Sequence, residues 1–140
     1  MIINIFGSTG IIGSKSLEII SNHFSKIKIN LLCANNNYIK LIKQSKIYNP
    51  KFVFINNNKY FNEIKKEINP KTKILNYNEL CSYLSSSRSD FSILAISGYN
   101  SLNYFTSILN NTKSLGLVSK EAVVSAGHLY KSFKKSSRSK

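Results

Sequence analysis

Three glycines at regular spacing follow an apolar run at the start of this chain. The run Ile2–Phe6 leads into Gly7, Gly10 and Gly13, within the sequence GSTGIIG. Glycine suits such a loop because a Cβ would hinder a sharp turn off a strand and the close approach of a pyrophosphate. The N–H groups and the positive dipole end of the following helix then face the phosphates. The motif predicts a dinucleotide-binding fold, although the fingerprint of such folds is Gly-x-Gly-x-x-Gly.

Short apolar runs alternate with segments of helical spacing along the chain. Expected strands are Ile2–Phe6, Lys28–Cys33, Phe52–Ile55, Lys73–Leu75, Phe91–Ile96 and Leu115–Val118, and expected helices include Ser16–Phe24, Tyr38–Tyr48 and Asn100–Leu109. Repeated strand–helix units imply a parallel sheet with helices on both faces. We therefore predict an α/β fold, a Rossmann-like doubly wound sheet over residues 1–133. We expect a polar loop at Ser82–Ser89 and a disordered basic tail at residues 134–140.

Composition narrows the class of protein further. With 42% hydrophobic residues the chain is not a disordered polymer, and no apolar run is long enough to cross a bilayer. No charged segment precedes an apolar one at the N-terminus, so we expect no signal peptide. Cys33 and Cys81 stand in apolar contexts without metal-ligand spacing. We predict two reduced, buried thiols in a cytoplasmic protein.

The formal charge of +14 raises the question of a nucleic-acid partner. Lysine is spread along the whole chain together with asparagine, and the lysines fall mostly on the polar faces of expected helices, as at Lys40, Lys43 and Lys46. This distribution favours a solvated surface over a nucleic-acid interface. We expect a small-molecule partner, with neither nucleic acid nor membrane.

The end of the second expected strand indicates which cofactor is bound. NAD-specific folds carry a carboxylate here, which binds the ribose hydroxyls. This chain has Asn35, Asn36 and Asn37 instead, with no acid nearby and with Lys40 close behind. A site without the carboxylate does not repel a 2′-phosphate, and amide and ammonium groups can donate to one. The sequence therefore favours NADPH over NADH, and the same asparagines can also cap the next helix.

Two segments resemble the 1-deoxy-D-xylulose 5-phosphate reductoisomerase family. The loop GSTGIIG is similar to that family's GSTGSIG, and residues 116–127, GLVSKEAVVSAG, resemble its LANKESLVxxG segment. Between them, residues 95–98 stand where the family has a strand that ends in a glycine beside the cofactor. The resemblance covers residues 1 to about 133 and implies NADPH-dependent conversion of 1-deoxy-D-xylulose 5-phosphate to 2-C-methyl-D-erythritol 4-phosphate in non-mevalonate isoprenoid biosynthesis.

The resemblance also assigns roles to individual residues. It places the diphosphate against the glycine loop and the adenosine ribose with its 2′-phosphate beside the asparagine turn. It implies a substrate-binding role for Lys120 and positions beside the cofactor for Ser119 and Glu121. The implied cofactor-binding residues are Gly7, Ser8, Thr9, Gly10, Ile11, Ile12, Asn35, Asn36, Asn37, Ser119 and Glu121. Ile11, Asn36 and Ser119 differ from the family's usual Ser, basic residue and Asn, so we expect reduced affinity for NADPH.

The resemblance implies a divalent metal, Mg²⁺ or Mn²⁺, held by carboxylates of a second domain. The six acidic residues of this chain have no spacing suited to such a site, so we expect no metal ligands and no catalytic residue here. The chain is interpreted as a fragment or a truncated product, inactive by itself. The resemblance implies a homodimer, which is typical of the family, and a monomeric state is the alternative for this chain.

Two other functions remain open from the residues. Tyr130 and Lys134 have the Tyr-x-x-x-Lys spacing of a short-chain NADP oxidoreductase, in which the lysine lowers the pKa of the tyrosine. Alternatively, the chain is a non-catalytic module whose basic surface binds nucleic acid or an acidic partner.

Overall fold

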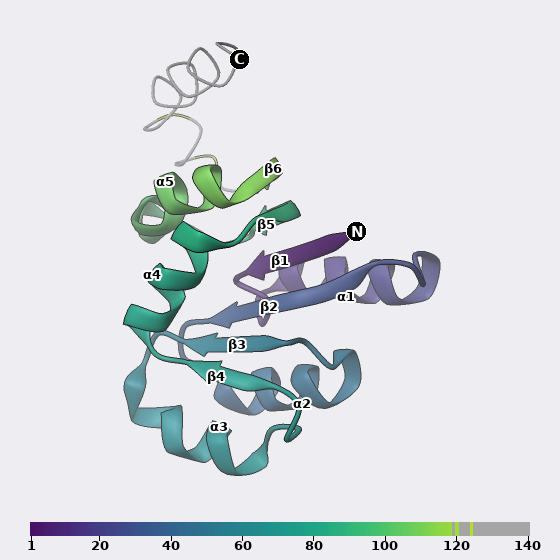
Figure 1. The fold of residues 1–140 in the computed structure, drawn as a ribbon, viewed down its shortest axis with the longest axis vertical. Helices are drawn as coiled ribbons and strands as arrows, with labels where there is room; N and C mark the ends of the chain where they lie inside the picture. Colours follow the sequence, from purple (N-terminus) through teal and green to yellow (C-terminus); the bar gives the residue numbers. More distant parts are fainter. Residues whose placement is uncertain (119, 121–123, 125–140) are drawn as a thin grey trace.

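Parallel strands with apolar residues on both faces build the centre of the molecule. The computed structural model describes residues 1–118, Lys120 and Val124. Its strands are β1 (Ile2–Phe6), β2 (Lys28–Ala34), β3 (Phe52–Ile55), β4 (Lys73–Leu75), β5 (Ser89–Leu94) and β6 (Thr112–Leu117). They form one parallel sheet in the order β4-β3-β2-β1-β5-β6 (Figure 1). This order confirms the doubly wound, Rossmann-like prediction.

Helices lie on both faces of the sheet, as the strand pattern requires. The helices are α1 (Ile11–His23), α2 (Tyr38–Tyr48), α3 (Phe61–Glu67), α4 (Tyr77–Ser86) and α5 (Leu102–Asn111), with short 3₁₀ turns η1 (Asn58–Tyr60) and η2 (Tyr99–Ser101). One core packs α1, α2 and α3 on side chains such as Ile3 and Ile5. The other packs α4 and α5 on Phe6 and its neighbours. Alternate residues of β1 thus enter opposite cores.

The region before β5 differs from the prediction. Ser82–Ser86, expected in a polar loop, form the second half of α4. The helix begins with a capping box of Asn76 and Glu79, and Leu84 is buried in the core. The hydroxyls of Ser85 and Ser86 both donate to the Ser82 carbonyl, so these serines need no loop to satisfy them.

The thiol prediction is half correct. Cys33 is buried in β2, and Cys81 is exposed on α4. The reason is the helical period, because the core side of α4 is taken by Leu80 and Leu84 and the residue after Leu80 points outward. Neither cysteine forms a disulfide.

A buried polar cluster joins β1, α4 and α5 beside the second core. Asn4 lies in the middle of β1 and is fully buried. Its amide nitrogen donates to Asn111 Oδ1 at 3.0 Å, and its Oδ1 accepts from the Tyr83 hydroxyl at 3.1 Å. The Ser89 hydroxyl also donates to Asn111 Oδ1, at 3.1 Å. These bonds explain how the polar residue Ser89 can start β5, two residues before the predicted strand.

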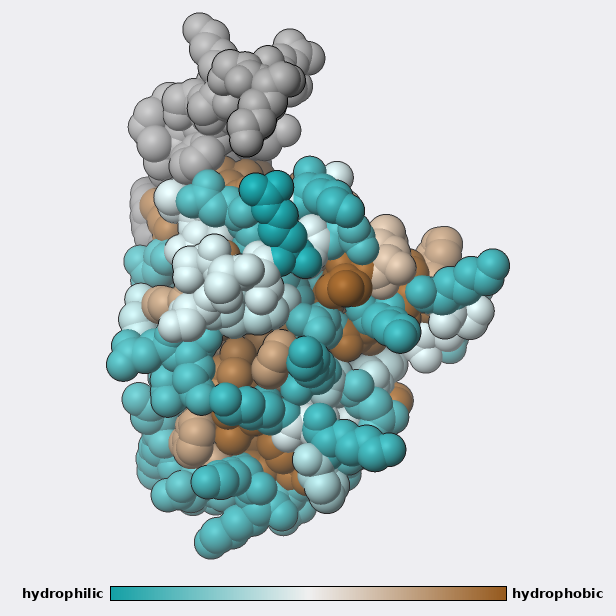
Figure 2. All heavy atoms as spheres, viewed as in Figure 1, coloured by the Kyte–Doolittle hydropathy of each residue, from teal (hydrophilic) through white to brown (hydrophobic). Residues whose placement is uncertain are grey.

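One face of the molecule is largely hydrophilic. Figure 2 shows hydrophilic residues over most of one face, with hydrophobic ones in separate patches between them. Lys40 is half-buried, while Lys43 and Lys46 are exposed on α2, which largely confirms the predicted polar face of that helix. Among the helices of the described residues, none has both the length and the apolar character needed to span a membrane.

We predict that Asn111→Ala lowers the free energy of unfolding by about 2–4 kcal/mol, because Asn4 and Ser89 lose their partner inside the core. Urea denaturation measures this loss. Asn110→Ala is the matched control, since Asn110 is the exposed neighbour on the same helix. Its effect should stay within about 0.5 kcal/mol. Equal losses in the two variants would contradict the role of the cluster.

Candidate functional site

The glycine loop is held to the sheet by one carbonyl group. The N–H groups of Gly7 and Ser8 both donate to the Cys33 carbonyl at the end of β2, each at 2.9 Å. The loop then turns back, and the Gly10 N–H donates to the Gly7 carbonyl at 3.1 Å. Burial raises the pKa of the Cys33 thiol, which therefore stays neutral beneath the loop. The loop conformation is thus fixed without a ligand.

The three glycines serve different purposes. Gly7 has φ +84°, and a Cβ there would lie 2.5 Å from the carbonyl oxygen of Ala95, which directly follows β5. A Cβ at Gly13 would overlap the Gly7 carbonyl, so α1 could not pack so closely on the loop. Gly10 has an extended conformation, and its Cβ would meet no protein atom closer than 3.4 Å. The fold requires Gly7 and Gly13, whereas Gly10 leaves space above the loop for a ligand.

The other predicted loop residues divide between the interior and the surface. Ser8 is buried, and its hydroxyl donates to Gln44 Oε1 at 2.9 Å. Gln44 Nε2 in turn donates to the Ser8 carbonyl at 2.8 Å, so Ser8 supports the loop from inside and offers no free donor. Ile11 and Ile12 are exposed at the start of α1. Within the described part of the chain, their N–H groups have no partner, as expected for a first helical turn.

A pocket opens beside this loop at the carboxyl ends of the strands. It has a volume of about 390 Å³ and lies where β1 pairs with β2 on one side and β5 on the other. Open α/β sheets bind ligands at this reversal of strand order. Its lining comes from the ends of β1, β2, β3 and β5 and from η2 and α5, and comprises Gly7, Thr9, Gly10, Cys33, Ala34, Asn35, Phe54, Asn56, Ala95, Ile96, Ser97, Asn100, Asn103 and Tyr104.

The turns after β2 and β3 are joined by paired asparagines. Asn56 Nδ2 donates to Asn35 Oδ1 and Asn57 Nδ2 donates to Asn36 Oδ1, both at 3.0 Å. Asn37 caps α2, with its Oδ1 accepting the Lys40 N–H at 3.1 Å. The predicted capping role is confirmed for Asn37. In all three residues of the triplet the side-chain oxygen is engaged, so each offers its NH₂ group as a donor.

Sequence reasoning missed several residues that line this pocket, Asn56 and Tyr104 among them. Asn56 directly follows β3, and its position could have been inferred because neighbouring parallel strands end at the same edge. Tyr104 lies on α5, far away in the sequence, and no local pattern marks it. Its hydroxyl donates to Asn56 Oδ1 at 3.2 Å.

The last group of predicted residues lies largely beyond what the structure describes. Lys120 is exposed in a helical position and does not line the pocket. Ser119 and Glu121 lie outside the described residues, as do Tyr130 and Lys134 of the alternative oxidoreductase and the predicted tail. In residues 1–118, with Lys120 and Val124, no three His, Cys, Asp or Glu side chains gather as a metal site would require.

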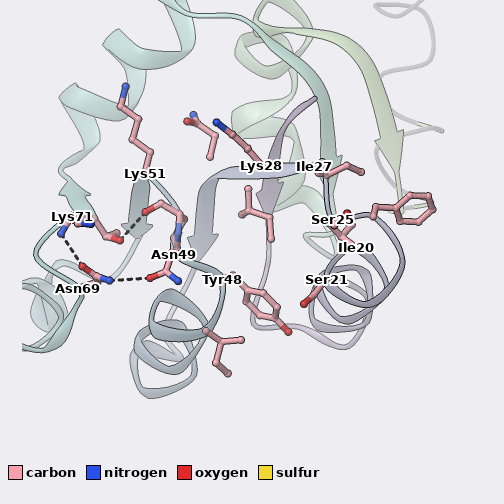
Figure 3. Close-up of a pocket in the computed structure, with 16 residues that line it drawn as sticks. Ile20, Ser21, Ser25, Ile27, Lys28, Tyr48, Asn49, Lys51, Asn69 and Lys71 are labelled. Atoms are coloured by element: carbon pink, nitrogen blue, oxygen red, sulfur yellow. Dashed lines mark hydrogen bonds between the residues drawn. The ribbon is translucent and has the colours of Figure 1, made fainter.

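A larger hollow of about 810 Å³ lies at the opposite edge, where β2, β3 and β4 begin (Figure 3). The side chains of two loop asparagines hold neighbouring loops together there. Asn69 Nδ2 donates to Asn49 Oδ1 at 2.9 Å, while Asn69 Oδ1 accepts the Lys71 N–H at 3.0 Å (Figure 3). Because this edge carries the amino ends of the strands, we place the functional site at the pocket beside the glycine loop.

Comparison with known proteins identifies relatives of this chain. Residues 3–127 match the model of the family described as 1-deoxy-D-xylulose 5-phosphate reductoisomerase. The reductoisomerase of Pelagibacter ubique is 37% identical over 132 residues, and that of Wigglesworthia glossinidia brevipalpis is 35% identical over 133. These alignments cover 92% and 91% of this chain. The chain spans 34% of the length of each of these two relatives.

Solved structures share the fold. The reductoisomerase from Zymomonas mobilis in complex with NADPH superposes with a TM-score of 0.85 at 24% identity, covering 96% of this chain and 36% of that one. A reductoisomerase in complex with NADPH, fosmidomycin and magnesium gives a TM-score of 0.84 at 24% identity, covering 97% and 34%. At this identity the likeness establishes the fold.

We predict that Gly13→Ala lowers the free energy of unfolding by about 3 kcal/mol, because its Cβ would overlap the Gly7 carbonyl. Gly10→Ala is the matched control and should change stability by no more than about 0.5 kcal/mol, since its Cβ has room. Chemical denaturation of the two variants checks the difference. If Gly13→Ala proves as stable as Gly10→Ala, the packing of α1 on the loop does not require a glycine at position 13.

Proposed function

The chain belongs to the 1-deoxy-D-xylulose 5-phosphate reductoisomerase family, and we propose that it forms the NADPH-binding part of such an enzyme. The observation that carries this proposal is the donor set beside the pocket. Asn35, Asn36 and Asn37 each offer an NH₂ group, and Lys40 follows them in the first turn of α2. Donors without a carboxylate suit a 2′-phosphate, whereas a ribose 2′-hydroxyl would call for an acceptor.

The glycine loop accounts for the other end of the nucleotide. The open side of Gly10 and the free N–H groups of Ile11 and Ile12 can receive a diphosphate, which the dipole of α1 also favours. Thr9 lines the same pocket. Ser8 holds the loop in shape through Gln44. The residues present therefore fit a phosphorylated dinucleotide.

The reaction of the whole enzyme is proposed from the family. NADPH, when bound, supplies a hydride to the rearranged sugar phosphate. We propose that Lys120 binds the phosphosugar as a positive point charge and that Ser119 and Glu121 lie beside the cofactor. The residues described here hold no metal cluster, so the Mg²⁺ or Mn²⁺ of the family is assigned to the part of the enzyme that this chain does not span.

We predict that the chain binds NADPH more tightly than NADH, and that Gly10→Val abolishes binding of both while the melting temperature is unchanged. The valine side chain would occupy the space intended for the diphosphate, whereas the extended backbone at Gly10 accepts any residue. Isothermal titration calorimetry measures the affinities.

Ile19→Val is the control for this experiment, because Ile19 is exposed further along α1 and outside the pocket. It should bind as the unmodified chain does. Equal affinity for the two cofactors would refute the assignment of the asparagine turn. Normal binding by Gly10→Val would show that the phosphates lie elsewhere.

We predict no reductoisomerase turnover by these 140 residues alone. The reaction needs a metal ion to hold and polarise the substrate oxygens. The described residues contain no cluster of His, Cys, Asp or Glu that could bind such an ion. The assay follows NADPH absorbance with 1-deoxy-D-xylulose 5-phosphate and Mn²⁺. A fusion at about Phe133 to the remaining domains of a relative should restore turnover. Metal-dependent turnover by the chain itself would mean that its residues have been assigned the wrong roles.

A further inference from the structure

In the asparagine turn that we assign to the 2′-phosphate, the orientation of the Asn35 amide depends on residues outside the turn. Asn35 can present either its oxygen or its NH₂ group to a ligand, and the two choices suit different ribose substituents. Its Oδ1 accepts from Asn56 Nδ2 at 3.0 Å, which leaves the NH₂ group outward. What fixes Asn56 therefore decides what Asn35 offers.

Tyr104 fixes Asn56. Its hydroxyl donates to Asn56 Oδ1 at 3.2 Å, and with that oxygen engaged the Asn56 amide directs Nδ2 toward Asn35. The tyrosine is itself anchored, because its ring is half-buried on α5 with its centroid 6.2 Å from that of Phe6. Burial raises the pKa of Tyr104 to about 12, so the hydroxyl keeps its proton even in alkaline solution.

The backbone supports the same arrangement. The Asn56 N–H donates to the Ala34 carbonyl at 2.9 Å, and the Asn57 N–H donates to the Asn35 carbonyl at 3.0 Å. These backbone bonds already hold the turns after β2 and β3 together. The side-chain bonds therefore serve to orient the amide groups of Asn35 and Asn56. Both Asn56 and Tyr104 also line the pocket.

We propose that Tyr104 and Asn56 are positioning residues that set cofactor selectivity, through a hydrogen-bond relay from Tyr104 to Asn56 to Asn35 that presents an NH₂ donor to the 2′-phosphate. The inference rests on the proposed NADPH-binding function and extends it to residues from β3 and α5. Neither residue need touch the cofactor for the relay to act.

Asn56→Asp tests the relay most directly. An aspartate has no donor for Asn35, so the Asn35 amide should turn its NH₂ group inward and its oxygen outward, and the new charge also disfavours a phosphate. We expect affinity for NADPH to fall by at least tenfold and affinity for NADH to stay equal or rise. Asn58→Asp adds the same charge on η1 without touching the relay and should change the NADPH affinity by less than threefold.

Tyr104→Phe tests the relay without a change of charge. It keeps the ring and removes the donor, so NADPH affinity should fall about three- to tenfold while NADH affinity and the melting temperature are unchanged. In an Asn35→Ala background the same substitution should have no further effect, because its action passes through Asn35.

Calorimetry with both cofactors distinguishes the outcomes. If the unmodified chain binds neither nucleotide, the proposed function fails and the relay fails with it. If it selects NADPH and both Asn56→Asp and Tyr104→Phe keep that selectivity, only the relay is overturned. An equal loss of both cofactors in Tyr104→Phe would likewise overturn it, since that pattern indicates a general structural role.

Discussion

The absence of a Cβ at two positions of the glycine loop is the constraint on which the arrangement of this protein depends. At Gly7 the backbone of β1 passes against the Ala95 carbonyl that follows β5, and at Gly13 helix α1 passes against the carbonyl of Gly7. The loop is therefore confined between a helix and a neighbouring strand. Together with the Cys33 carbonyl, these contacts fix its shape before any ligand arrives. Three of the residues in these contacts, Gly7, Cys33 and Ala95, also line the pocket.

The sequence was sufficient for the architecture because short apolar runs and segments of helical spacing alternate regularly along the chain. The predicted helix Tyr38–Tyr48 and strand Phe52–Ile55 have the observed bounds. The bounds of β5 and α4 could not be predicted in this way, because their serines are satisfied by distant or helical partners. The Ser89 hydroxyl can be buried in a strand because it donates a hydrogen bond to Asn111 on another element. Local polarity suggests a loop wherever such a partner is unknown.

The site shows the same division between local pattern and tertiary contact. The glycine loop and the asparagine turn follow from their place after β1 and β2, and Gly7, Thr9, Gly10 and Asn35 indeed line the pocket. The sequence located that turn but could not predict which side-chain group each asparagine offers to a ligand. An asparagine is both donor and acceptor, and which group it offers here depends on partners that follow β3. The burial of Ser8 also depends on a tertiary partner, since Gln44 comes from α2.

The position of β1 in the sheet has a consequence for how the chain folds. β1, which precedes the other strands of the sheet in the chain, lies between β2 and β5, and its pairing with β5 joins residues 3–6 to residues 91–94. Contacts so distant in sequence carry a large loop-closure entropy and slow the folding of parallel sheets. On the ribosome, β1 to β4 can associate early, but the glycine loop cannot reach its final contacts until Ala95 has emerged. The glycine loop, although it precedes every helix, thus takes its final contacts only after β5 has formed.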